Sequence, residues 1–144
     1  MKRMALMLAL TFAVGIVVVV AGNHVLNAQQ VPVKRTDLLK ADIVGMEGKE
    51  LIVQLVEFAP GGASGKHYHP GHEANYVLEG SGTFEREGQP PTTRKVGDVN
   101  YAPAKVVHEG KNASTTAPLK LVVFRIHEKG QPITVSVTEP YFQK

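Results

Sequence analysis

Apolar and polar residues alternate with a period of two through much of the chain after residue 48. In residues 50–58 the alternation separates one set with Leu51, Val53 and Leu55 from another with Ile52, Gln54 and Val56. This is the pattern of a half-buried β-strand. Shorter strand-like segments follow, each bounded by Gly, Pro or Asp turn signals. The further strands expected are residues 67–69, 75–78, 83–86, 93–96, 99–102, 106–109, 119–127 and 133–137.

Two segments are harder to assign from pattern. Residues 36–43 fit either one helical turn or part of a strand. Gly80-Ser81-Gly82 is a tight-turn signal, and we expect it to join residues 75–78 and 83–86 as a hairpin. Many short strands with no clear helix predict an all-β sandwich or barrel.

The first 28 residues have a different character. Lys2 and Arg3 precede an almost wholly apolar run from residue 5 to residue 22, and Leu26-Asn27-Ala28 is a usable cleavage site before Gln29. We interpret residues 1–28 as a signal peptide, or as an uncleaved N-terminal membrane anchor. Both interpretations place residues 29–144, a single domain, in the periplasm, in the extracellular space or on the outer side of the membrane.

Charge and cysteine content exclude several function classes. Without residues 1–28 the chain has 14 basic and 13 acidic residues, so its basic character is no sign of nucleic-acid binding. The chain has no cysteine, which excludes disulfides, thiolate ligands and a thiol nucleophile.

Half of the six histidines lie in one short stretch. His67 and His69 are two residues apart and therefore project to the same face of a strand. After a turn at Pro70-Gly71, Glu73 can return to that face. Two imidazoles and a carboxylate that converge can form the first coordination shell of a divalent transition metal. His72 has the opposite parity, and we do not expect it to be a ligand.

A second stretch supplies another histidine. It runs over residues 97–112 and contains Gly97, Pro103, His108 and Asn112. Together the two stretches resemble the two cupin motifs. The first is Gly61, five residues, His67-x-His69, three residues, Glu73, six residues and Gly80; the second is Gly97, five residues, Pro103, then His108, three residues and Asn112. Lys105 stands where the family pattern has a glycine, so we expect a looser or differently shaped turn there.

The cupin resemblance implies a double-stranded β-helix, or jelly-roll barrel, with one metal ion bound by His67, His69, Glu73 and His108. Neutral imidazoles and a carboxylate suit Fe, Mn, Ni, Zn or Cu, and the residues do not select among them. Four protein ligands on a six-coordinate ion leave two positions open. The resemblance also implies a homodimer, for which exposed sheet edges offer a route.

Three further residues are candidates for the pocket. Asn75 shares the parity of Glu73, and Tyr101 precedes Pro103 near the expected cavity mouth. Arg125 would hold an anionic substrate if it faced inward, but we favour a position facing solvent. We expect Asn112 to fix the loop after His108.

These features favour an exported metal-dependent enzyme, of oxygenase or isomerase type, that acts on a small organic substrate inside the barrel. The alternative is a non-catalytic module that binds a metal or small ligand outside the cytoplasm. Polar groups converging in the cavity beside the ligands would favour the enzyme, and a purely apolar lining would favour the module.

Overall fold

A computed structural model of the protein describes residues 33–138. The signal peptide or anchor expected at residues 1–28, and the beginning of the predicted domain, lie outside the described residues. Between Val33 and Thr138 we find no helix with the length and hydrophobicity needed to cross a membrane.

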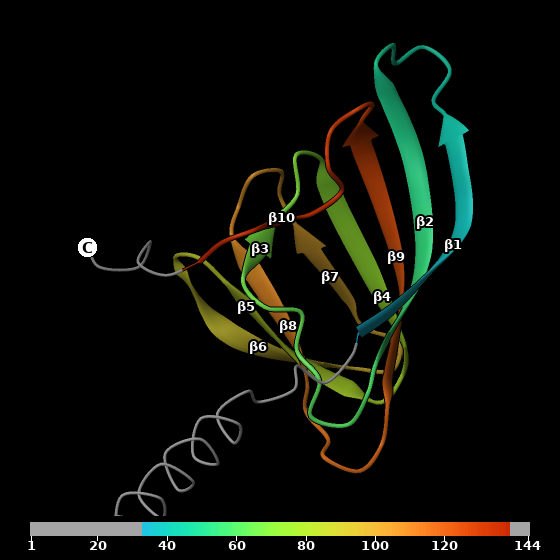
Figure 1. The fold of residues 1–144 in the computed structure, drawn as a ribbon. Helices are drawn as coiled ribbons and strands as arrows, with labels where there is room; N and C mark the ends of the chain where they lie inside the picture. Colours follow the sequence, from blue (N-terminus) through green and yellow to red (C-terminus); the bar gives the residue numbers. More distant parts are fainter. Residues whose placement is uncertain (1–32, 139–144) are drawn as a thin grey trace, which may run out of the picture. The chain divides into compact units, whose positions relative to one another are not determined.

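Residues 33–138 form two antiparallel sheets that face each other (Figure 1). The first sheet has the order β1-β2-β9-β4-β7 and the second has the order β10-β3-β8-β5-β6. The all-β prediction is therefore confirmed. The strands are β1 (Val33–Asp42), β2 (Lys49–Phe58), β3 (His67–Tyr68), β4 (His72–Glu79), β5 (Ser81–Arg86), β6 (Gln89–Lys95), β7 (Val99–Ala102), β8 (His108–Asn112), β9 (Leu119–Glu128) and β10 (Val135–Ser136).

The ambiguous segment at residues 36–43 belongs to β1, which pairs with β2 along its length. The expected hairpin at Gly80 is wrong, because β4 pairs with β9 and β7 while β5 pairs with β6 and β8. The chain crosses between the sheets here. Gly80 permits the crossing, since its φ is +79° and an added Cβ would lie 2.4 Å from the Pro118 carbonyl oxygen.

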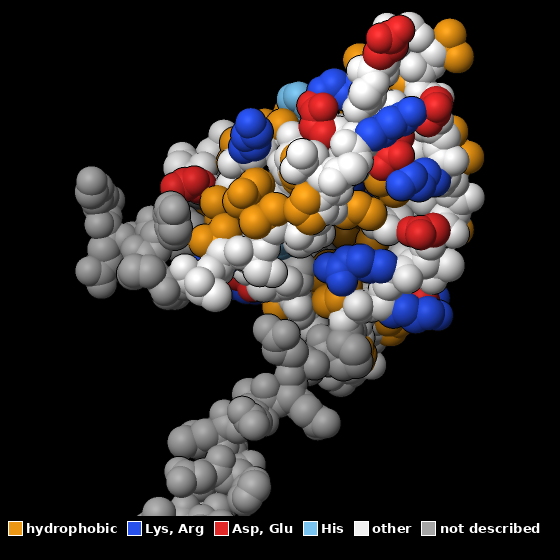
Figure 2. Space-filling view, turned by 45° about the horizontal axis from the view of Figure 1, so that its top comes forward, with side chains coloured by type: hydrophobic (Ala, Val, Ile, Leu, Met, Phe, Trp, Pro, Cys, Tyr) orange, Lys and Arg blue, Asp and Glu red, His pale blue; other side chains and the backbone are white. Residues whose placement is uncertain are grey.

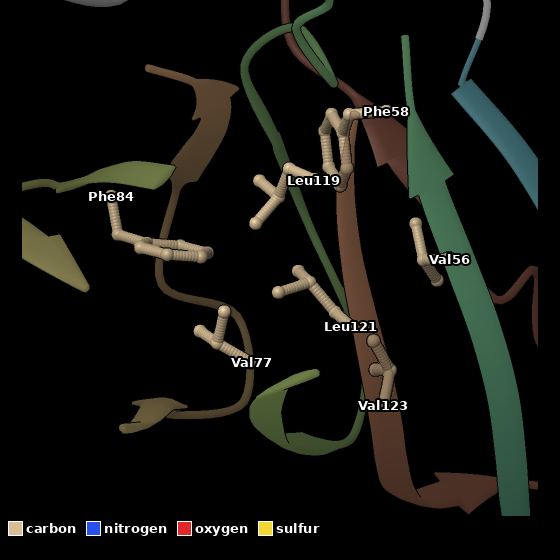
Figure 3. Packing of buried hydrophobic residues seen from close by; sticks show 7 residues of the cluster. All are labelled: Val56, Phe58, Val77, Phe84, Leu119, Leu121 and Val123. Atoms are coloured by element: carbon tan, nitrogen blue, oxygen red, sulfur yellow. The ribbon is translucent and has the colours of Figure 1, made fainter. Parts of the chain in front are cut away.

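The space between the sheets is divided into an apolar and a polar part. Figure 3 shows Phe84 of the second sheet reaching toward Leu119, Leu121 and Val77 of the first. The complete buried cluster is Val56, Phe58, Val77, Phe84, Leu119, Leu121 and Val123. Further along the same inward face, buried polar residues replace apolar ones: Gln54, Glu73, Asn75, Arg125 and His127. The apolar cluster supplies the hydrophobic contribution to stability, and the polar part is left for the site.

Asn112 closes the loop that follows β8, as expected. Its side-chain amide donates to the carbonyl oxygens of Phe58, Ala59 and Ala117, and its Oδ1 accepts from the Ser114 N–H. The motif asparagine thus ties the end of β2 to the loop before β9.

The turn at Lys105 places a lysine in a conformation that is unusual for a residue with a side chain. Lys105 has φ of 63°, and within residues 33–138 it is the only non-glycine residue with positive φ. Its N–H donates to the His69 carbonyl oxygen at 2.8 Å. Lys105 thus adopts the left-handed conformation that a glycine prefers, and the looser or differently shaped turn stays a prediction.

We therefore expect Lys105→Gly to raise the free energy of unfolding by up to about 1 kcal/mol. The left-handed conformation costs an L-residue roughly 1–2 kcal/mol, which exceeds the roughly 0.5–1 kcal/mol lost through the greater freedom of glycine in the unfolded chain. Urea denaturation measures the change. Lys95→Gly in β6 is the matched control and should destabilise the protein, and an equal loss in both variants would contradict the argument.

Candidate metal centre

Three histidines converge between the sheets from separate parts of the chain. His67 on β3 lies directly opposite His108 on β8, and His69 lies in the short connection from β3 to β4. The ring centroids are 4.5 Å apart for His67 and His108, 4.8 Å for His67 and His69, and 5.0 Å for His69 and His108. The spacing of the histidines in the sequence therefore corresponds to a real cluster.

The backbone sets the orientation of each ring. The Nδ1 atoms of His67, His69 and His108 lie 2.7, 2.6 and 2.9 Å from the carbonyl oxygens of Gly65, Ile133 and Val106. A carbonyl oxygen can only accept, so each Nδ1 carries the proton and donates it. In a neutral ring the lone pair is then on Nε2, which is how metal-ligating histidines are held in place.

Among the described residues, the Nε2 atoms on the other side of the rings lack hydrogen-bond donors. Within residues 33–138, the buried Nε2 atoms of His69 and His108 have no hydrogen-bond partner. One ligand atom from each of the three histidines lies within 4.8 Å of the other two. A Zn–N bond is about 2.0–2.1 Å, so one ion can join nitrogens up to about 4.2 Å apart after small ring movements. The three imidazoles therefore fit a divalent metal ion.

Burial keeps these rings in the form that binds a metal. Desolvation lowers the pKa of His67 to about 4, although its bond to the Gly65 carbonyl acts in the opposite direction. Desolvation also lowers the pKa of His108. Both side chains are therefore neutral at neutral pH, as ligation requires.

Glu73 enters the cluster from the opposite sheet. Burial alone would raise the pKa of its carboxyl, but the contact with His69 and the charge of Arg125 lower it, so Glu73 is ionised. Its Oε2 lies 2.8 Å from the Nε2 of His69, and the same oxygen accepts from the Nε of Arg125 at 2.8 Å. A carboxylate oxygen has more than one lone pair, so this ion pair leaves Glu73 able to ligate. Its role as the fourth ligand stays a prediction.

The contact between His69 and Glu73 is itself an argument for a cation. With the proton on Nδ1, the lone pair of His69 Nε2 faces a carboxylate oxygen at 2.8 Å. Two acceptors this close require a proton or a positive ion between them. A metal ion would serve this pair and the unpartnered Nε2 of His108 together.

Arg125 is not at the surface, and the preference for a solvent-facing position is wrong. Only 4% of Arg125 is exposed, and besides Glu73 it binds the Oε1 of Gln54 at 2.5 Å. Every second residue of β9 from Leu119 to His127 is buried, and Arg125 belongs to this inward-facing set. Asn75 is also buried, with its Nδ2 3.3 Å from the Oε1 of Glu73.

Tyr101 and His72 lie on the outer face of the first sheet. The Tyr101 side chain is 48% exposed and its ring stacks on that of His72, whose Nδ1 is 2.7 Å from the tyrosine hydroxyl. Tyr101 lies opposite Ala74 in the register, next to the pair of Glu73 and Ala102, whose side chains face inward. Neighbouring residues of a strand face opposite sides, so Tyr101 faces outward. Its side chain therefore does not point at the histidines, and His72 is outside the cluster, as expected.

A small cavity of about 40 Å³ adjoins the cluster. Sequence patterning did not identify three of its polar lining residues: Arg35, Ser64 and Asn100. Asn100 lies opposite the inward-facing Asn75 in the register, and it is two residues from the inward-facing Ala102. This alternation along β7 was the sequence signal that could have identified Asn100. Apolar residues line the rest of the cavity: Val56, Phe58, Phe84, Leu121 and Val123.

Two facing antiparallel sheets with three converging imidazoles and an adjacent ionised glutamate define a jelly-roll protein with a candidate metal site. The sequence model of the cupin domain family matches residues 54–125. The chain belongs to this family. The recognition from the two motifs is therefore confirmed. No curated protein matches the chain significantly in sequence.

Solved structures share the fold. An uncharacterised protein with a double-stranded β-helix domain from Klebsiella pneumoniae is 19% identical, with a TM-score of 0.60 over 74% of this chain and 85% of that one. A cupin-like protein from Thermotoga maritima is 28% identical, with a TM-score of 0.60 over 73% and 75%. A DMSP lyase from Ruegeria pomeroyi is 22% identical, with a TM-score of 0.59 over 72% of this chain and 51% of the lyase.

We predict that His67→Ala and His108→Ala each abolish stoichiometric metal binding, because each removes one of the three converging nitrogens. His72→Ala is the matched control and should bind metal as the parent does, since His72 lies outside the cluster. Elemental analysis of purified protein after metal loading and desalting measures the content. Loss of metal in His72→Ala with retention in His67→Ala would contradict the site.

Proposed function

We propose that the protein is a metal-dependent enzyme acting on a small organic substrate between the two sheets. The observation that carries the proposal is the lining of the cavity beside the histidines. Polar groups converge there in addition to the candidate ligands: Arg35, Ser64, Asn75, Asn100 and Arg125. A site that only binds metal has no need of them, whereas a site that orients a substrate does.

The residues around the cavity have different roles in this proposal. His67, His69 and His108, with Glu73 as the proposed fourth ligand, would hold the metal, which supplies Lewis acidity and open positions for a substrate or O₂. Arg125 keeps Glu73 ionised and in place through its Nε and Nη2. The Oδ1 of Asn75 is buried, and no hydrogen-bond partner for it exists within residues 33–138. It is therefore available to accept from a substrate.

The proposed chemistry is of oxygenase or isomerase type, and the metal is Fe, Mn, Ni, Zn or Cu. The DMSP lyase shows that a protein with this fold can be a lyase, but at 22% identity it supports the fold alone. The pattern of residues 1–28 supports export, so we place the enzyme outside the cytoplasm, either free or anchored. The non-catalytic binding module is the second candidate.

We expect the protein to keep its β-rich fold when a chelator removes the metal, because the apolar cluster between the sheets needs no ion. The ferrous form should bind nitric oxide, since a catalytic site keeps an exchangeable position. Circular dichroism checks the first result, and the electron paramagnetic resonance of an iron–nitrosyl complex checks the second.

His108→Ala, loaded in the same way, serves as the control and should give no nitrosyl signal. If the metal-free protein is unfolded, or the iron-loaded parent shows no nitrosyl, the enzyme proposal fails. The binding module then takes its place.

We further propose that the protein is a homodimer. The outer face of the first sheet carries exposed, uncharged side chains on three adjacent strands, with the half-buried Ala74 and Val122 between them: Tyr76, Leu78, Val99, Tyr101, Phe124 and Ile126. A second copy of this face would pack on it without like-charge repulsion, as a two-fold interface requires. The supporting surface is a sheet face, whereas the expectation from sequence concerned sheet edges.

Light scattering should give the mass of two chains at micromolar concentration. Phe124→Lys places a charge in this face and should shift the mass toward one chain. Leu38→Lys, at a 57% exposed position in β1, is the control and should stay dimeric. A parent protein with the mass of one chain would exclude the dimer.

A further inference from the structure

We propose that Arg35 on β1 binds the negative group of the substrate, and that this substrate is a small carboxylate with a single negative charge. The inference rests on the proposed function, because the other end of the substrate would face the histidine cluster. Arg35 is absent from both motifs and was not identified as a site residue from sequence.

The register of β1 directs Arg35 toward the interior. Arg35 opposes Val56, which is buried in the apolar cluster, and Arg35 lines the cavity together with His67 and Glu73. Arg35 is also exposed to solvent. A residue that lines the cavity and reaches solvent stands at its entrance, where an incoming ligand meets it first.

Among the described residues, Arg35 has no carboxylate at ion-pair distance, unlike its neighbours Lys34 and Lys40. Lys34 lies 3.4 Å from Glu57, and Lys40 lies 3.1 Å from Glu50. Figure 2 shows charged side chains of both signs gathered over β1 and β2. For the guanidinium of Arg35, we find neither a hydrogen bond nor an ion pair to any residue from Val33 to Thr138.

The second guanidinium in the cavity is already occupied. Arg125 binds Glu73 and Gln54, and Gln54 in turn donates to the Oδ1 of Asp37 at 2.6 Å. The charge of Glu73 therefore compensates Arg125, whereas Arg35 has no carboxylate at ion-pair distance within residues 33–138. Desolvation and the neighbouring Arg125 lower the pKa of Arg35, and the charge of Glu73 acts in the opposite direction, so Arg35 remains charged at neutral pH.

The chemistry of the cavity defines the ligand. One guanidinium with no ion-pair partner within residues 33–138 matches one carboxylate, which it can bind through two parallel N–H···O bonds. The cavity of about 40 Å³ admits only a small group, and its apolar wall suits a short hydrocarbon portion. A larger anion fails the size condition, and a doubly charged anion fails the match to a single guanidinium.

The test uses propionate and its neutral isostere propionamide, titrated into the metal-loaded full chain and followed by NMR. Propionate should bind the parent, and Arg35→Gln should weaken its binding at least tenfold while leaving propionamide binding unchanged. Arg35→Lys should recover part of the loss, since it restores the charge without the planar fork. Lys34→Gln removes a charge one residue away on the opposite face and should change propionate binding less than twofold.

Metal content, measured on the same samples, should be equal in the parent and Arg35→Gln. Propionate binding that is absent from the parent, or equal in the parent and Arg35→Gln, overturns the inference. Binding of methyl phosphate tenfold tighter than propionate, and dependent on Arg35, overturns the assignment to a carboxylate. Failure of the proposed function is a separate result, in which the parent protein holds no metal or gives no nitrosyl signal. That result does not decide whether Arg35 binds propionate.

Discussion

The buried ion pair between Glu73 and Arg125 is the interaction on which the polar half of the interior depends. Transferring a carboxylate or a guanidinium from water to the interior costs several kcal/mol for each ion, and each partner here offsets the cost of the other. The two residues oppose each other on adjacent strands, so the register of β4 and β9 places them together without strain. Removing one partner would leave an isolated buried charge, at a cost of about 3–5 kcal/mol.

This pair also connects the site to the first sheet as a whole. Arg125 bonds to Gln54 on β2, and Gln54 bonds to Asp37 on β1. On its other side Glu73 meets His69, which is held by the carbonyl of Ile133 near β10. A single chain of polar contacts therefore runs from an edge strand across the sheet to the histidines. Networks of this kind keep side chains in one arrangement, which a metal site and a substrate site both require.

The parts of the site that follow from residue spacing could be predicted, and those that depend on which face is buried could not. His67 and His69 are two apart, and Glu73 follows a Pro-Gly turn, so convergence was readable even though β3 and β4 lie in different sheets. For β9 the pattern was uninformative, because Val122, Phe124 and Ile126 are as apolar as Leu119, Leu121 and Val123. With both faces apolar, alternation gives no sign of which side holds Arg125. The crossing at Gly80 was missed for a similar reason, since a short glycine turn fits a hairpin and a change of sheet equally well.

The electrostatic balance of the interior is compatible with the proposed binding of an anion and a metal together. Burial keeps His67 and His108 neutral, so these rings add no charge of their own. Glu73 and Arg125 form an ion pair, whereas the guanidinium of Arg35 at the entrance has no ion-pair partner within residues 33–138. A divalent cation at the histidines would add further positive potential inside walls of low polarity, where screening by water is weak. A monoanionic ligand lowers this potential at the end where its carboxylate meets Arg35, and a neutral ligand does not. Affinity would then come from the guanidinium at the entrance, and orientation from the difference between this charged end and the apolar wall of the cavity.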